Sequence, residues 1–431
     1  MVLALAAAFT AANAQVKSVS AASSALEKAK ADTQNPKKAE KLATWLNYGK
    51  ALVNAYDAPA GSGWIGASRQ DLQLLSNNEK PLSTEIVEVA GQEMEKEVYE
   101  TRNYYFNQAG QLSLVEVTKP ISETALQDAV AAYAKAAELD GKCSKAKDIK
   151  AALQSIQNKF TERAYTSYTF GDYGKASLDF ENAAIAAGTA PLSQLDTNSL
   201  YNAGFTAWAT GDIARARKFF EDCYAAGYYS EDGEVFAKLA DIALKDEDAE
   251  KGRDLLEEGF QKFPQSQSIL VGLINYYLTH DGSTERLFEL LGKAKENEPN
   301  NASLYYVEGN IRKQLGMTDE AIAAYRACAE IDPNYAYGYI GEGILYYDLA
   351  LQYQEEAQIE MNDAKYRALD AKFVEALKNC IPAFEKAIDL VDDSTKVGVA
   401  EYLKNACFRF RAEDEYAAKY AKYEAIVSAG K

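Results

Sequence analysis

The chain has 431 residues, and its 64 acidic and 46 basic side chains give a formal net charge of −18 at pH 7. A surface this negative repels nucleic acid and anionic membranes, and no local basic cluster in the sequence offsets it, so the expected partners are basic or neutral. Hydrophobic residues make up 48% of the chain and there are only 9 prolines, which excludes a largely disordered polymer.

The first fourteen residues, MVLALAAAFTAANA, are apolar and uncharged. They end in Ala12-Asn13-Ala14, which fits the hydrophobic region and A-x-A cleavage site of a secretory signal peptide. We expect residues 1–14 to be removed and the protein to be periplasmic or secreted, without a membrane span, because the segment is too short to cross a bilayer. No cysteine near the site would carry a lipid anchor. The alternative is the frayed end of a buried helix.

The segment that follows predicts paired helices around small residues. After a predicted helix at 20–31, Trp45 and Gly49 stand four residues apart and fit the first helix of a pair. The matching second helix, LQDAVAAYAKAAELD, carries the small residue Ala129, which lies 80 residues beyond Gly49. We therefore predict that residues 58–121 are an insertion between the two helices of one unit.

The predicted insertion differs in kind from the helical sequence around it. Two runs of alternating β-branched and aromatic residues, 97–106 and 111–118, flank an Asn-Gln-Ala-Gly turn. This pattern predicts a β-hairpin at 97–118, and because a two-stranded hairpin needs cover, we expect it to pack on the first repeats. The glycine-rich loop at 58–64 lacks the lysine and the strand-to-helix setting of a phosphate loop, so it does not indicate nucleotide binding.

Later in the chain, small or medium-sized residues recur in pairs that are twelve residues apart. The pairs are Ala164 with Ala176, Gly204 with Ala216, Ala240 with Gly252, Asn275 with Leu287, and Gly309 with Ala321. Two antiparallel helices approach closely only where neither has a bulky side chain at the crossing. The first members from Gly204 onward, continued by Gly343, are spaced by 36, 35, 34 and 34 residues, a period that chance does not maintain.

The clearest unit, ASLYYVEGNIRKQLGMTDEAIAAYRACAEIDPN at 302–334, resembles the tetratricopeptide (TPR) repeat, whose period is about 34 residues. The resemblance spans roughly 41–428 in about seven helix pairs. It implies an all-α, TPR-like helical-repeat superhelix over residues 15–431, with the small β-hairpin insertion near the N-terminus. An exported TPR protein of this style also resembles envelope proteins of Bacteroidota.

The C-terminal part departs from the regular period. Its segment LQYQEEAQIEMNDAKYRALDAKFVEAL keeps a helical pattern, with Asn362-Asp363 as the turn, and predicts an extended helical hairpin at 349–375. A final charged pair of helices at 397–431 is interpreted as the cap that a solenoid needs to cover its last open face.

Residues able to carry out catalysis are scarce. The one histidine, His280, precedes Asp-Gly at a predicted helix end and is interpreted as a C-terminal cation or cap. A single histidine removes most Ser/His and Cys/His sites and multi-histidine metal sites from consideration. The five cysteines are far apart and odd in number. Cys223, Cys328 and Cys380 fall where the repeat takes a small buried residue and are interpreted as small core residues, with a Cys380–Cys407 bridge left open. We predict no enzyme activity, no cofactor and no metal.

In the TPR family the first helix of each pair lines a concave groove that holds peptides. The family's lysine and asparagine clamp for C-terminal carboxylates is not reproduced, which disfavours chaperone tails as ligands. Aromatic residues on those helices would bury a large area at little entropic cost, although each of them could instead pack between units. The inward positions that the resemblance implies are Tyr165, Tyr168, Tyr201, Phe205, Trp208, Tyr276, Tyr306, Asn310 and Tyr347.

Three functions are compatible with these patterns. The leading hypothesis is a non-enzymatic scaffold that binds a protein or peptide partner in this groove. The first alternative is a structural component that docks into an envelope assembly or a homodimer through its insertions, and the second is glycan or peptidoglycan binding through the same aromatic residues. Groove binding predicts that alanine at Tyr201 and Trp208 abolishes capture of the partner, whereas docking predicts that deletion of 351–373 does so.

Overall fold

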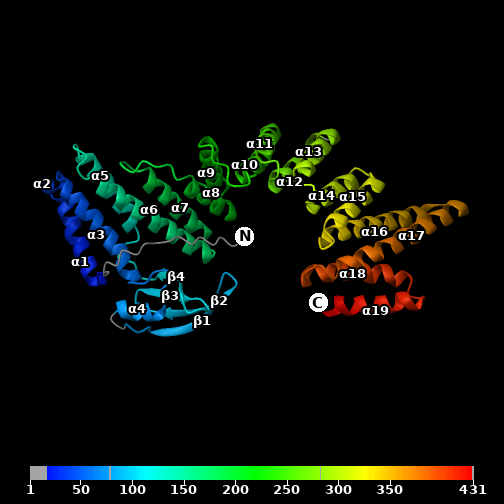
Figure 1. Cartoon of the computed structure of the whole chain (residues 1–431), viewed down its shortest axis with the longest axis horizontal. Helices are drawn as coiled ribbons and strands as arrows, with labels where there is room; N and C mark the ends of the chain where they lie inside the picture. The colour runs from blue at the N-terminus through cyan, green and yellow to red at the C-terminus, as the bar shows by residue number, and fades with distance from the viewer. Residues whose placement is uncertain (1–16, 77–78, 282, 430–431) are drawn as a thin grey trace. The chain divides into compact units, whose positions relative to one another are not determined.

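The computed structural model of the chain describes residues 17–76, 79–281 and 283–429 (Figure 1). The chain divides into two compact units, Met1–Ser230 and Glu231–Lys431, and each is described by itself.

The predicted signal peptide, residues 1–14, lies outside the described residues. Its removal and the export of the protein therefore stay predictions. In the part of the chain that the structure describes, no helix is both long and apolar enough to cross a membrane.

The first unit contains helices in sequential pairs and one small sheet (Figure 1). Helix α3 packs against α5, α6 against α7 and α8 against α9, while α1 packs on α3. The bounds are α1 Val19–Gln34, α2 Pro36–Ala39, α3 Leu42–Ala60, α4 Arg69–Leu75, β1 Ser83–Val89, β2 Gln92–Val98, β3 Arg102–Phe106, β4 Leu112–Val117, α5 Ala125–Leu139, α6 Ala146–Thr169, α7 Tyr173–Gly188, α8 Thr197–Ala209 and α9 Ile213–Ala225.

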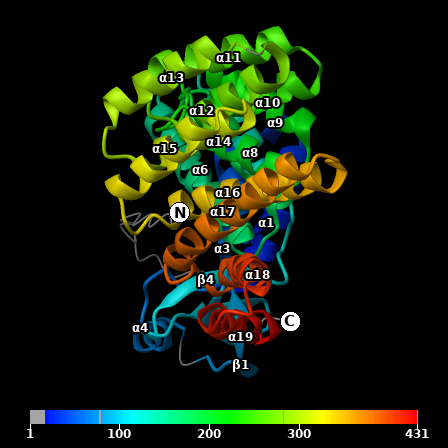
Figure 2. The same cartoon turned by 90° about the vertical axis from the view of Figure 1, so that its right-hand side faces the viewer.

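In its described residues the second unit holds five further helix pairs, and α16 and α17 are its longest helices. Figure 2 shows α16 and α17 next to each other. The helix pairs of the two units, with a small sheet near the N-terminus, confirm the predicted fold class. The bounds are α10 Glu234–Lys245, α11 Ala249–Lys262, α12 Gln267–Tyr276, the π-helical turn η1 Tyr277–Asp281, α13 Thr284–Asn297, α14 Ala302–Gln314, α15 Thr318–Ile331, α16 Ala336–Ile359, α17 Asp363–Ala387, α18 Asp393–Arg409 and α19 Asp414–Ala429.

Glycines set how closely the paired helices approach. A Cβ atom added at Gly309 would lie 2.5 Å from Cδ1 of Tyr325, and one at Gly341 would lie 2.4 Å from Cε1 of the same ring. Tyr325 is buried and its hydroxyl donates to Oδ1 of Asn310 at 2.8 Å. The small residues of the repeat thus make room for one large ring from the second helix.

The turns inside the pairs also follow from local sequence. Gly211 adopts a φ of 79°, a left-handed conformation that glycine enters without a Cβ clash. The carboxylate of Asp212 then accepts from the backbone N–H of Arg215 at 3.0 Å and caps α9, as expected of Asp at a helix N-cap. Gly171 and Asp172 form the same turn between α6 and α7.

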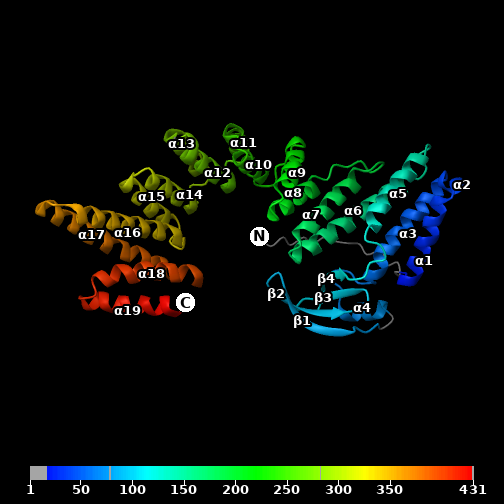
Figure 3. The ribbon, with the colours of Figure 1, turned by 180° about the vertical axis from the view of Figure 1, so that it is seen from behind.

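The insertion is larger than the predicted hairpin at 97–118. It holds a four-stranded antiparallel meander in the order β1-β2-β3-β4, together with α4 (Figure 3). The prediction of one strand over 97–106 is wrong, because a turn closed by the Tyr99 N–H and the Arg102 carbonyl, 2.8 Å apart, separates β2 from β3. The β3–β4 hairpin was predicted, whereas β1 and most of β2 were not.

The sheet packs on the first helices, as expected. The hydroxyl of Thr101 donates to the carbonyl of Pro59 at 2.8 Å, and that of Tyr104 donates to the carbonyl of Ala60 at 2.7 Å, so the end of α3 holds β3 and its preceding turn. The ring of Tyr105 lies 5.2 Å from that of Phe170 beyond α6.

The long hairpin of α16 and α17 turns at Asn362. The side chain of Asn362 caps α17 by accepting hydrogen bonds from the backbone N–H groups of Ala364 and Lys365. Its tip exposes apolar side chains: Met361 is 96% exposed and Ile359 is also exposed. The last pair begins at Asp393, whose predecessor Asp392 caps α18.

The cysteines are free thiols in this structure, Cys143 exposed and the other four buried. Cys380 and Cys407 belong to one hydrophobic core, and burial raises the pKa of Cys380 to about 12 and of Cys407 to about 11. They therefore act as small core residues here. His280 lies in η1 with its ring stacked on that of Tyr276 at 5.2 Å.

Glu308 makes the stability of the second unit depend on pH. It is buried, and it accepts from Lys295 Nζ at 2.6 Å and from Arg312 Nη2 at 2.7 Å. Burial by itself would raise the pKa of Glu308, but the hydrogen bonds from Lys295 and Arg312 outweigh it and hold the pKa below its usual 4.5.

A carboxylate with a lowered pKa stabilises the folded state above the unfolded-state pKa, and this contribution is lost as the pH falls through the folded-state value. We therefore expect Glu308→Gln to destabilise the chain at pH 7, and the difference from wild type to shrink as the pH falls below 4.5. Urea unfolding at a series of pH values measures this. Glu320→Gln, at an exposed position on α15, is the control. If the difference in free energy of unfolding between wild type and Glu308→Gln stayed constant down to pH 3, the stabilisation would not come from the ionised Glu308 carboxylate.

Candidate functional site

Several of the groove residues predicted in the first unit pack against other aromatic rings. The ring of Tyr201 stacks on Phe205 at 6.3 Å and lies 6.0 Å from Tyr228, and Tyr165 meets Phe180 edge-on at 5.2 Å. Tyr168 is exposed.

Trp208, also on α8, is half-buried. The structure thus brings Tyr201 and Phe205 together on α8, with their rings shared between internal packing and the surface.

The four residues predicted in the second unit lie in different environments. Tyr276 is only 5% exposed and packs on Tyr277 and His280, so its ring offers no surface to a ligand. Asn310 is engaged by the buried hydroxyl of Tyr325.

Tyr306 joins a cluster of three tyrosine rings. Its ring lies 5.8 Å from that of exposed Tyr337 and 6.3 Å from that of Tyr335, and the latter two rings are 5.5 Å apart. These tyrosines come from α14 and the start of α16.

Tyr347 lines an open pocket of about 450 Å³ between α16, α17 and α18, and this pocket is called the Tyr347 pocket below. Helices α16 and α18 are the first helices of two successive pairs, and α17 is the second helix of the earlier pair. Its lining consists of Tyr347, Leu351, Gln354, Phe373, Leu377, Asn405, Phe408, Arg409, Arg411 and Ala412.

The floor of the Tyr347 pocket is apolar and fixed. Phe373 and Leu377 on α17 are buried in the core, and the ring of Tyr347 packs edge-on against that of Tyr402 at 5.0 Å. Burial raises the pKa of Tyr347, and a hydrogen bond with Asn405 partly opposes it, so this hydroxyl is neutral at physiological pH.

Two arginines form the rim of the pocket. The guanidinium of Arg411 lies 3.6 Å from the centre of the Phe408 ring and donates to the Phe408 carbonyl at 3.2 Å. Arg409 lies over the ring of Phe373 at 5.8 Å. Within the described residues neither guanidinium forms an ion pair with a carboxylate, although the chain has 64 acidic residues. The pocket therefore combines an apolar floor with two cations that can accept an acidic ligand.

The sequence reasoning did not identify this rim. Arg409 and Arg411 alternate with aromatic residues in Phe-Arg-Phe-Arg at 408–411, and this short basic and aromatic run is the signal that could have been used. No group of three or more His, Cys, Asp or Glu side chains in the described ranges is arranged to hold a metal ion.

The comparison with family models gives a match to the family described as Tetratricopeptide repeat at residues 197–226 and 302–335. These ranges contain α8 with α9 and α14 with α15. A comparison with curated proteins gives no match.

Several solved structures are similar. The C-terminal part of a TPR repeat-containing protein from Cytophaga hutchinsonii is 15% identical and has a TM-score of 0.39, and the similarity covers 62% of this chain and 95% of that one. A tetratricopeptide repeat protein from Parabacteroides merdae is 16% identical with a TM-score of 0.38, covering 58% of this chain and 98% of that one.

YrrB, described as a TPR protein with an unusual peptide-binding site, is 15% identical with a TM-score of 0.32, covering 46% of this chain and 93% of that one. The two ranges matched by the family model lie within the part of the chain where small residues recur about every 34 residues. In the structure these small residues pack closely on large rings. The chain therefore contains tetratricopeptide repeats.

Proposed function

We propose that this protein is a non-catalytic scaffold that binds a protein or peptide partner through the Tyr347 pocket, in the periplasm or outside the cell. The observation that carries the proposal is the pairing of an apolar floor with two arginines that have no carboxylate partner in the described residues. In an acidic chain, most exposed arginines have a carboxylate of the same chain within reach. Arg409 and Arg411 pair with none in the described residues, so both are available to bind a ligand. Arginine is also enriched at binding hot spots.

The chemistry of the pocket defines the segment that it would bind. A side chain such as Leu or Phe would fill the space over Phe373 and Leu377, and an adjacent Asp or Glu would reach Arg409 or Arg411. A hydrogen bond to a charged group contributes about 1.5–3 kcal/mol. Any acidic peptide could form such hydrogen bonds with the two arginines. The apolar floor would favour those peptides that also carry a hydrophobic residue next to the acidic one.

Selection of peptides from a random library on the purified chain tests the proposal. We expect the enriched peptides to carry an apolar residue beside an acidic one, and Arg409→Glu/Arg411→Glu to weaken their binding by about tenfold or more. The matched control is Lys365→Glu/Arg367→Glu, which makes the same charge change at exposed positions on α17. Peptides without acidic residues, or equal losses in both double variants, would overturn it.

The exposed tip of the α16–α17 hairpin supports a second candidate function, docking into an assembly or a homodimer. Met361 and Ile359 place apolar surface at the end of a long hairpin, where it contributes nothing to the core. If Ile359→Ser/Met361→Ser abolishes self-association or partner binding while the rim variants do not, docking through the tip is the better description.

A further inference from the structure

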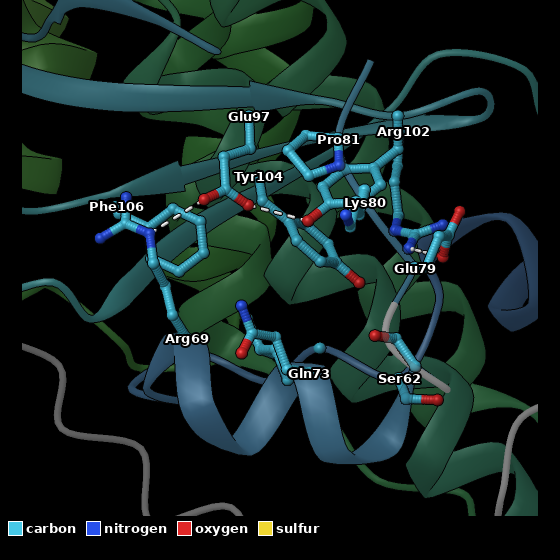
Figure 4. A pocket seen from close by; sticks show the side chains of 14 residues that line it. Ser62, Arg69, Gln73, Glu79, Lys80, Pro81, Glu97, Arg102, Tyr104 and Phe106 are labelled. Atoms are coloured by element: carbon cyan, nitrogen blue, oxygen red, sulfur yellow. Dashed lines mark hydrogen bonds and ion pairs between the residues drawn. The ribbon is translucent and has the colours of Figure 1, made fainter. Parts of the chain in front are cut away.

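A second pocket lies in the first unit, outside the helix pairs, between α4 and the face of the sheet (Figure 4). Its volume is about 380 Å³, within the range of pockets that hold small molecules. Arg69 and Gln73 extend into it from α4, and Glu97, Arg102 and Tyr104 face it from the strands. We call it the sheet pocket.

The glycine-rich loop after α3 forms one wall of the sheet pocket by close approach. A Cβ atom at Gly61 would lie 2.7 Å from the hydroxyl oxygen of Tyr104, and one at Gly63 would lie 2.9 Å from its Cζ. The glycines therefore let this loop pack directly on the Tyr104 ring, which fixes the ring in place.

Arg102 is the central group of the sheet pocket. Its side chain is only 7% exposed, and its guanidinium lies over the rings of Tyr99 at 4.5 Å and Tyr104 at 4.9 Å. Nη2 donates to Oε2 of Glu79 at 2.6 Å, while Nε is buried with no hydrogen-bond partner among the described residues. A buried N–H without an acceptor costs free energy. On the edge of the guanidinium formed by Nε and Nη2, only Nη2 has a hydrogen-bond acceptor among the described residues.

A carboxylate fits that edge better than Glu79 does. Arginine binds carboxylates in a fork, with two parallel N–H groups donating to two oxygens. Glu79 engages only one nitrogen, and a free carboxylate that occupied both Nε and Nη2 would satisfy the edge completely. Glu79 has an exposed side chain and lies outside the strands and helices, so it can move away without disturbing the sheet.

The charges around the pocket agree with an anionic ligand. Arg69 is already held by Glu97 at 2.9 Å and by Glu95 at 2.7 Å, and it lies over the Phe106 ring at 4.0 Å. Lys80, next to Glu79, lines the pocket and makes no ion pair within the described ranges. Lys80 is therefore the cation of the pocket lining that has no carboxylate partner in the described ranges, and it is next in sequence to Glu79, which holds Arg102.

We propose that the sheet pocket binds a small carboxylate-bearing molecule with a flat ring, whose carboxylate displaces Glu79 from Arg102 while the ring packs beside Tyr99 and Tyr104. The rings of Tyr99 and Tyr104 are 5.2 Å apart and tilted by 57°, and such aromatic surfaces favour a flat ligand. The class of the anionic group is indicated by the Glu79 carboxylate that now pairs with Arg102. This site is separate from the Tyr347 pocket, and the inference does not depend on the proposed function.

The test uses the full chain and a matched pair of probes, 4-hydroxyphenylacetate and the neutral 4-hydroxyphenylacetamide, titrated at pH 7 by ligand-observed NMR. We expect the carboxylate to bind about tenfold or more tightly than the amide, because only the carboxylate forms charge-assisted bonds. A peptide that ends in a free tyrosine carboxylate distinguishes a chain terminus from a free acid as the source. Equal binding of acid and amide, or no binding of either at 20 mM (roughly the weakest range such bonds support), would overturn the proposal.

Two substitutions separate binding from folding. Glu79→Gln removes the internal competitor and is expected to strengthen binding of the acid by about threefold or more, since the competent state becomes more populated. A gain of affinity is not a result that misfolding produces. Glu88→Gln, at an exposed position on β1, is the control and should change nothing. Arg102→Lys keeps the charge but loses the fork, so affinity that is unchanged in this variant would also overturn the proposal.

Discussion

Replacement of Tyr325 by alanine is expected to lower the free energy of unfolding of the second unit by about 3–5 kcal/mol, the cost of removing a large buried ring. The ring is buried against Gly309 and Gly341, which leave no side chain of their own to fill the space. Its hydroxyl is also the donor to Asn310, which would lose that partner. Urea unfolding followed by circular dichroism measures the effect.

The control for this prediction is Tyr366→Ala, which removes an exposed tyrosine of the same unit and should cost about 0.5 kcal/mol or less. Substitutions at the two glycines test the same packing by adding a side chain next to the Tyr325 ring. Gly309→Ala and Gly341→Ala push a methyl group against the Tyr325 ring and should each cost about 1–3 kcal/mol, whereas Gly292→Ala meets no neighbour within 4 Å and should be neutral or slightly stabilising. If alanine at Tyr325 cost no more than at Tyr366, the ring would not be the centre of this packing.

Arg163→Met is expected to lower the free energy of unfolding of the first unit by about 3–5 kcal/mol, because it leaves a buried carboxylate unpaired. The side chain of Asp179 on α7 is 4% exposed, and its two oxygens accept from Nε of Arg163 at 2.8 Å and from Nη2 at 2.5 Å. The pair joins α6 to α7 at the point where the two helices pack.

The double variant Arg163→Met/Asp179→Leu removes both charges and is expected to recover most of the lost stability, because a buried ion pair contributes little beyond an apolar pair of similar size. The exposed pair Lys135 and Glu138 on α5 is the comparison, and Lys135→Met should cost about 1 kcal/mol or less. A double variant less stable than Arg163→Met would show that the ion pair itself, rather than the unpaired carboxylate, dominates.

The insertion shows why part of the fold was not accessible from sequence. Strands β1 and β2 mix glutamates with apolar residues over 83–98, and the chain turns between them at Ala90-Gly91, where both residues have positive φ. Such polar strands carry little hydrophobic signal and are held by pairing across the hairpin, including Lys96 with Glu85 at 2.8 Å. The Ala-Gly turn between these two glutamate-containing runs was the available signal.

The candidate site was predicted in part for a related reason. The repeat register placed Tyr347 on a first helix, and the structure places it in a pocket. The same register placed Tyr276 on an equivalent surface, but η1 follows α12 directly and its Tyr277 and His280 pack on that ring. The repeat spacing assigns a residue to one face of a helix. It does not show whether a local departure from the α-helix, such as η1, brings other side chains over that residue.

The sequence by itself determined the period, the helix pairs, and the small residues at which they cross, because these depend on spacings within about 34 residues and on the volume of single side chains. Only the tertiary structure decided what surrounds each pocket. Arg409 lies over the ring of Phe373, and Glu79 accepts a hydrogen bond from Arg102, through contacts between separate elements. Such contacts depend on how whole elements pack, and no local pattern encodes them.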